Sequence, residues 1–330
     1  MLGNKPVLQG QDLRRFVLEI GLHFSNIVFV QGRSVFESND SEAVHDMRVA
    51  SRRLRQALTL FKDYYPSLSR KRISKKVRSL TRILALPREM DVNAQLLRSF
   101  GLNGGLVLQT THEHLLSWCE REQNRLRCRM LKALKKLDLC QLDSDIRRWG
   151  HVGRGHPREE SNGNSGPPLA TFLSQLPALL AAKASPVLAF RPAAPSLESD
   201  EALHQLRIST KKLRYALELI KPLLPEGEIS PPIDRCRSLQ ELLGKIHDAA
   251  ALIQLIQQHQ RWLDERKLVL LSHGCGRIVG EFQESKQRLV SEVTGAHESL
   301  VSELSTFLDS SKSPEPSQTS SVLSETAKNA

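Results

Sequence analysis

The strongest constraint on the fold of this chain is a segment that occurs twice. HDMRVASRRLRQAL at positions 45–58 aligns without gaps to HQLRISTKKLRYAL at positions 204–217, and six of the fourteen positions are identical. The offset of 159 residues persists outside the segment, because Pro66 matches Pro225 and Leu84 matches Leu243. A repeat of this length indicates that the 330 residues form two related halves.

Both halves have the periodicity of helices, and strand patterns are nearly absent. Apolar residues recur every three to four positions through most of the chain. Prolines after position 176 predict an irregular stretch over 177–200, and Gly274 and Gly276 predict a break in the last helix. The sequence therefore predicts an all-α fold with helices over about 11–38, 41–66, 70–86, 91–100, 106–139, 200–219, 229–246, 249–260 and 265–308.

A Gly- and Pro-rich segment, 150–168, separates the halves and is typical of a linker. We expect one domain over 10–308, with a first helical half at about 10–149 and a second at about 169–308. The polar segment 309–330 has the composition of a disordered tail.

Charge is distributed unequally between the halves. Lys and Arg number 47 against 36 Asp and Glu, which gives a net charge of +11. Residues 1–150 hold 27 basic and 15 acidic residues, a net of +12, whereas the remainder is close to neutral. This excess favours a polyanionic partner. Aromatic residues make up only 5%, which argues against a protein that stacks on exposed bases.

The repeated helix carries a stripe of basic residues in each half. Because each helical residue advances about 100°, the motif positions fall within an arc of about 80°. A third predicted helix carries a further basic face, of which one residue has a basic counterpart in the second half. Guanidinium groups one turn apart suit the phosphates of an extended polymer. The stripe residues are His45, Arg48, Arg52 and Arg55, then His204, Arg207, Lys211 and Arg214; the third-helix set is Lys75, Arg78 and Arg82, with Arg237 in the second half.

These motifs resemble the CHAD domain, the conserved-histidine α-helical domain. The two H-x-x-R-x-x-x-R/K-R/K-L-R helices are followed by turns, LPREMDVN with Arg88 and Asp91 and KIHDAA with His247 and Asp248, over about residues 10–308. Glu89 stands where the family usually has Asp. The resemblance implies two antiparallel four-helix bundles related by a pseudo-twofold, and a basic surface that binds inorganic polyphosphate through the stripe residues.

The resemblance also implies association with polyphosphate granules and no catalysis. The E-x-E-x-K signature of the CYTH triphosphatase domain, which precedes many CHAD domains, is absent from this sequence. Walker A, GxSxG and HExxH motifs are absent as well. We therefore expect a stand-alone, non-enzymatic CHAD protein of the cytoplasm, without a membrane-spanning segment.

Two other readings were weighed against this one. A metal site at His45 and His204 is disfavoured, because both lie among arginines that repel a divalent cation; we expect no metal and no cofactor. Sequence-nonspecific nucleic-acid binding is the stronger alternative, since any basic surface gains from counterion release. No zinc finger or helix-turn-helix signature supports it.

Overall fold

The computed structural model describes residues 13–38, 40–101, 105–152, 167–224 and 227–310. Every regular element in these ranges is a helix, which confirms the predicted all-α class. The helices are α1 (Leu13–Glu37), α2 (Ser41–Leu60), η1 (Lys62–Tyr64), α3 (Ser67–Ile83), α4 (Ala85–Arg98), α5 (Leu106–Leu137), α6 (Leu139–Val152), α7 (Leu169–Leu188), α8 (Ala194–Glu198), α9 (Asp200–Ile220), η2 (Lys221–Leu223), α10 (Ser230–Glu265), α11 (Val269–Ser291) and α12 (Val293–Ser310).

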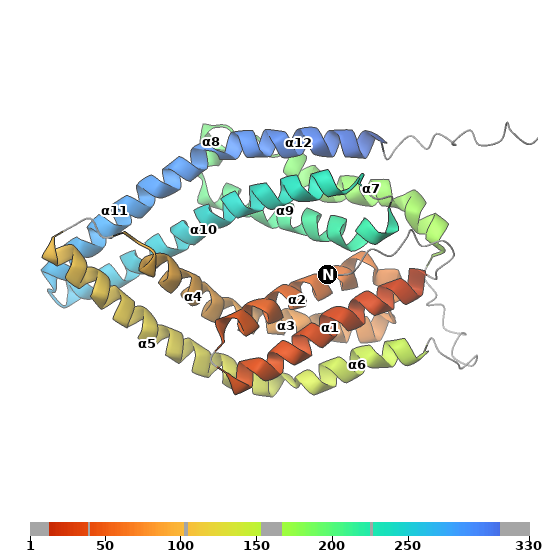
Figure 1. Ribbon diagram of the computed structural model, residues 1–330, viewed down its shortest axis with the longest axis horizontal. Helices are drawn as coiled ribbons and strands as arrows, with labels where there is room; N and C mark the ends of the chain where they lie inside the picture. Colours follow the sequence, from red (N-terminus) through yellow and green to blue (C-terminus); the bar gives the residue numbers. More distant parts are fainter. Residues whose placement is uncertain (1–12, 39, 102–104, 153–166, 225–226, 311–330) are drawn as a thin grey trace, which may run out of the picture.

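The helices form two groups that meet at both ends of the molecule (Figure 1). The first group contains α1, α2, α3 and α6, and the second contains α7, α9, α12 and the beginning of α10. At the left of Figure 1, α4 and α5 pack against the far part of α10 and against α11. The repeated helices α2 and α9 also contact each other directly. Contacts at two separate places therefore fix the halves in relation to each other.

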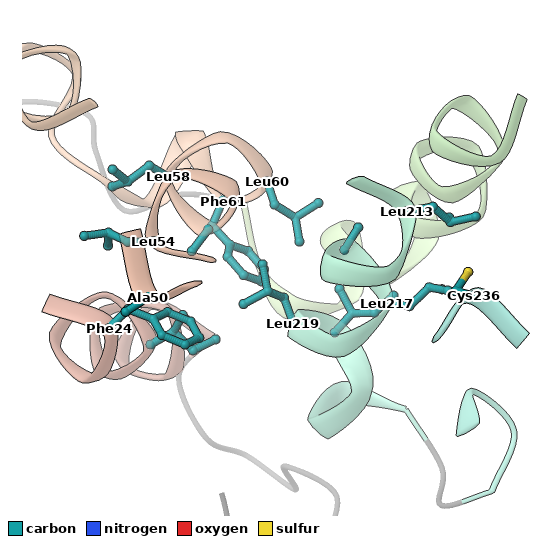
Figure 2. Close-up of a cluster of buried hydrophobic side chains, with 14 of the residues drawn as sticks. Phe24, Ala50, Leu54, Leu58, Leu60, Phe61, Leu213, Leu217, Leu219 and Cys236 are labelled. Atoms are coloured by element: carbon teal, nitrogen blue, oxygen red, sulfur yellow. The ribbon is translucent and has the colours of Figure 1, made fainter. Parts of the chain in front are cut away.

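Two apolar cores correspond to these contacts. The larger includes residues from α1, α2, α3 and α6 together with α7, α9, α10 and α12. Figure 2 shows its centre, where Leu60 and Phe61 at the end of α2 point toward Leu219 of α9. The smaller core joins α4 and α5 to α10 and α11, with Leu97, Leu115 and other fully buried side chains. Each core spans both halves of the chain.

The predicted boundary between helices 229–246 and 249–260 is wrong. α10 runs without interruption from Ser230 to Glu265, so His247 and Asp248 lie within a helix and not in a turn. The apolar residues Ile246, Ala249 and Leu252 are all buried on the same side of this helix. Burial along both cores keeps α10 continuous, although the sequence has a polar His-Asp pair at its middle.

The prediction of an irregular stretch from position 177 is also wrong over its first part. α7 continues to Leu188 with Pro177 and Pro186 inside it. The predicted break near Gly274 does not occur either, because α11 runs through it. Gly274 is buried against Thr111 of α5, and a Cβ at this position would overlap the Thr111 side chain. This glycine permits two helices to approach closely.

Two differences concern the first half. The short helix expected from position 91 begins at Ala85, with Pro87 in its first turn, where a helix needs no backbone donor. α6 was not predicted. Its buried Asp145 carboxylate receives Arg72 at 3.3 Å and Lys76 at 3.7 Å, both from α3. Most of the expected linker, 153–166, and the tail from 311 lie outside the described residues.

Candidate functional site

The two basic stripes begin at the same register of their helices. Asp40 caps α2 by accepting the Glu42 N–H at 2.8 Å, and Ser199 caps α9 by accepting the Ala202 N–H at 3.2 Å. Both helices then place their motif histidine four residues after the first helical residue. The caps end the helices at equivalent points because their side chains satisfy otherwise unpaired backbone donors.

The stripes of α2 and α9 come together across the contact between the two helices. Arg48, Arg52, Arg207 and Lys211 are half-buried, which is unusual for cations without carboxylate partners. Burial, followed by the charges of Arg52 and Arg207, lowers the pKa of Arg48 to about 10. An arginine of α2 is therefore close enough to one of α9 for mutual repulsion, and the structure brings the repeated motifs into one cluster.

Lys211 lies within this cluster. Burial, followed by the charges of Arg207, Arg52, Arg48 and Arg214, lowers the pKa of Lys211 to about 6. In the described part of the chain, Lys211 makes no ion pair. The cluster thus contains more positive charge than its protein surroundings neutralise.

One carboxylate of α10 stands against this charge. Burial raises the pKa of Asp248, while the charges of Arg207 and Lys211 act in the opposite direction. Arg52 also donates a hydrogen bond to Tyr215, a buried side chain of α9. These two groups offset only part of the repulsion, since several guanidinium groups share a single carboxylate.

Three histidines border the cluster. Burial and then Arg88 of α4 lower the pKa of His45, although Glu42 and Asp46 raise it. The His204 and His247 rings lie with their centroids 5.1 Å apart. Burial, followed by the charges of Arg207 and His204, lowers the pKa of His247 to about 4. An anion in this place would reverse the effect of the neighbouring cations and favour protonated imidazole.

A cleft opens beside the cluster, between α4, α9 and α10. It has a volume of ≈ 270 Å³ and is lined by polar and charged residues together with apolar residues of α9 and α10. His204, Arg207 and His247 line its basic part, and Glu89, Asp200 and Glu201 line its acidic part. The cleft gives solvent access to the second-half stripe.

Other predicted site residues lie farther from the cluster. Arg55 is exposed, and burial together with the charges of Arg52 and Arg78 lowers its pKa, which places Arg78 of α3 near the end of the first stripe. Lys75 and Arg82 are exposed on α3, but no contact joins them to α2 or α9. Arg237 is exposed and pairs with Asp234 at 2.6 Å, within its own helix.

The end of the second stripe is partly neutralised. Glu218 of α9 pairs with Arg214 at 3.7 Å and with Arg53 of α2 at 3.2 Å. The same two guanidinium groups lie over the Tyr215 ring, at 5.3 and 5.9 Å from its centroid. This clasp joins α2 to α9, and it makes Arg214 less available to a ligand than Arg207.

The candidate site set omitted residues that the structure places in the cluster. Asp248, His247, Tyr215 and Arg88 all act on the stripe residues. The KIHDAA and LPREMDVN segments were noticed, but they were interpreted as turns. The signal that could have identified them is helical spacing: His247 and Asp248 lie one turn from the buried Leu243 and Leu252.

The fold and the cluster define an all-α protein in which two repeated basic helices face each other. The CHAD domain family matches residues 29–257 of this chain, and the chain belongs to that family. It is similar to the crystal structure of the CHAD domain from the plant Ricinus communis, with a TM-score of 0.63 and 19% identity over 89% of this chain and 97% of that one. It is also similar to PptA from Streptomyces chartreusis, with a TM-score of 0.56 and 14% identity over 88% and 99%. No curated protein sequence matches it.

Two searches of the structure bear on other functions. Within the described ranges, no helix is both long enough and apolar enough to cross a membrane. Over the same residues, no group of three or more His, Cys, Asp or Glu side chains has an arrangement that could hold a metal ion.

Proposed function

We propose that this protein binds inorganic polyphosphate between the basic stripes of α2 and α9. The observation that carries the proposal is the half-buried cluster of Arg48, Arg52, Arg207 and Lys211, which repel one another and lower each other's pKa. Like charges held together in this way cost free energy in the absence of a ligand. An anion between the helices offsets that cost.

The length of the stripes favours a polymer over a single phosphate. His45 and Arg55 are ten residues apart on α2, which corresponds to about 15 Å along a helix axis. Successive phosphates of an extended chain can therefore contact successive turns. Polyphosphate carries no bases, and the half-buried position of the cluster between two helices suits so thin a chain.

Several finer points belong to the same proposal. The protein has no catalytic activity, resides in the cytoplasm and associates with polyphosphate granules. Its helices form two antiparallel four-helix bundles related by a pseudo-twofold. The offset of 159 residues supports this arrangement, because it carries the bounds of α2, 41–60, onto 200–219, while α9 covers Asp200–Ile220.

The alternative is a sequence-nonspecific nucleic-acid-binding protein, and competition distinguishes the two. Long polyphosphate, duplex DNA and RNA are compared at equal phosphate concentration and equal salt. We expect polyphosphate to bind more tightly, with an affinity that rises with chain length and falls steeply with salt. Equal or tighter binding of DNA would refute the proposal.

Charge-reversal pairs then test the site. Arg48→Glu plus Arg55→Glu is compared with Arg207→Glu plus Arg214→Glu, which changes the charge equally. The first pair should weaken binding more, because Arg214 is already engaged by Glu218. Each contact removed should lower the salt slope by about one unit. Equal losses would indicate that both stripes contribute alike, and a larger loss from the second pair would contradict the expected dominance of the first half.

A matched control lies on α1. Arg15 and Arg33 are exposed and pair with Glu19 at 3.0 Å and Glu37 at 3.8 Å. Arg15→Glu plus Arg33→Glu changes the net charge by the same amount away from the cluster. It should leave affinity nearly unchanged. A loss as large as that of the stripe variants would show that net charge, and not the cluster, determines binding.

A further inference from the structure

Lys211 is the only amine among the eight side chains of the two stripes. It is half-buried and lies among the guanidinium groups of Arg48 and Arg52 from α2 and of Arg207 and Arg214 from its own helix. A guanidinium holds its proton far more strongly than an amine does. The crowding of positive charge is therefore relieved at Lys211, which releases its proton while the arginines keep theirs.

The groups that face Lys211 come from three helices. α10 contributes Asp248, whose charge attracts the lysine, and His247, whose protonation the lysine opposes. α4 adds Arg88, which acts on Asp248. Positive charge predominates in this set, so the amine remains uncharged at neutral pH.

An uncharged amine is a nucleophile. At pH 7.5, an amine with a pKa of about 6 is almost entirely uncharged, whereas an exposed lysine is uncharged to about 0.1%. The adjacent Lys212 is exposed and provides that comparison within the same helix. The lower basicity of Lys211 reduces its intrinsic reactivity, and this offsets part of the advantage.

We propose that Lys211 is a site of covalent acylation by acyl phosphates. The proposal rests on the anion-binding role of the cluster, because the arginines would hold the phosphate of the reagent beside the amine. The Nζ lone pair then attacks the acyl carbon, a C–N bond forms and the C–O bond to phosphorus breaks. Inorganic phosphate leaves with the bonding electron pair, and Nζ loses a proton to water. No oxidant or reductant is needed.

Acylation would change the site permanently. The amide that forms cannot take up a proton, so Lys211 no longer contributes an ammonium group when polyphosphate binds. The acyl group also fills space between α2 and α9. Acylation of Lys211 is therefore expected to weaken polyphosphate binding, and bound polyphosphate to protect Lys211 from acylation.

The test uses the unmodified full chain with acetyl phosphate at pH 7.5. Peptide mass spectrometry follows the initial rates of acetylation at Lys211 and Lys212. We expect Lys211 to react at least about tenfold faster, after the lower intrinsic reactivity is allowed for. An uncharged acyl donor should give a smaller ratio, because the arginines have no phosphate to hold. Long polyphosphate should suppress the reaction at Lys211 and leave Lys212 unaffected.

The outcomes separate this proposal from the proposed function. Equal rates at Lys211 and Lys212 would overturn the acylation site, even where polyphosphate binds tightly. Selective acylation of Lys211 without measurable polyphosphate binding would support the acylation site and refute the proposed polymer ligand. A ratio that is the same for the charged and the uncharged donor would overturn phosphate guidance by the arginines.

Discussion

Replacing Lys211 with methionine should stabilise the ligand-free protein and weaken polyphosphate binding at the same time. Methionine keeps the apolar stem that packs between α2 and α9, but it carries no amine. The folded protein must hold Lys211 uncharged among arginines, whereas the unfolded chain lets the amine take up its proton. Removal of the amine therefore destabilises the unfolded state relative to the folded one.

The pKa values define the magnitude and the pH range. The pKa of Lys211 is about 6 in the folded protein and has a model value of 10.5. At pH 7.5 the difference is three pH units, each worth 1.36 kcal/mol, which gives an upper limit of about 4 kcal/mol. Solvent contact of the half-buried side chain reduces this to about 2 kcal/mol. The cost is largest below about pH 6, falls as pH rises, and disappears above about pH 10.5.

Urea unfolding at pH 7.5 and at pH 9.5 measures the effect. The gain in the free energy of unfolding should be about 2 kcal/mol at the lower pH and below about 1 kcal/mol at the higher pH. Lys212→Met is the matched control, because this neighbour is exposed, and it should shift stability by less than about 0.5 kcal/mol. A destabilised Lys211→Met, or a gain that does not change with pH, would refute the argument.

Three further predictions follow from the site and from the packing of its helices. His45→Ala plus His204→Ala should flatten the rise in polyphosphate affinity between about pH 6 and pH 5, measured by titration, since an anion raises the pKa that burial lowers at His45; an unchanged profile would assign both histidines a structural role. Asp145→Asn should cost about 1–3 kcal/mol in thermal or urea unfolding without weakening polyphosphate binding, because the buried carboxylate holds α6 against α3. Gly274→Ala should cost about 1–3 kcal/mol through overlap with α5, whereas Gly280→Ala, with open space around it, should be neutral or stabilising; equal effects would contradict the close-packing role.

The sequence determined the repeated helices well because several local signals agree there. Asp40 and Ser199 are good N-caps, and apolar residues follow each cap with a helical period. Helical spacing also places Lys75, Arg78 and Arg82 on one face, and all three are exposed in the structure. These features depend on residues close together in the chain, which periodicity can detect.

The incorrect boundaries depend on contacts between distant segments. Pro177 and Gly274 weaken a helix in isolation, but each lies in a helix that packs along a large apolar core. Gly274 is needed where Thr111 approaches from α5, more than 160 positions away in the sequence. Local propensity cannot report such a contact. The same limit explains why His247 and Asp248 were placed in a turn.

The facing of the two stripes was likewise beyond the reach of periodicity. A helical pattern shows which residues share a face, but not which surface lies opposite. The structure shows Arg48 of α2 near Arg207 of α9, a pairing of like charges that isolated helices would avoid. Apolar contacts at Phe61 and Leu219 and the second core at α4, α5, α10 and α11 hold the helices in place. Because both ends of the cluster are fixed, the arginines cannot separate, and their repulsion is relieved only by an anion or by loss of the Lys211 proton. Stability in this protein is therefore expected to depend on anions: sulfate or phosphate should raise the unfolding temperature of the normal chain more than that of Lys211→Met.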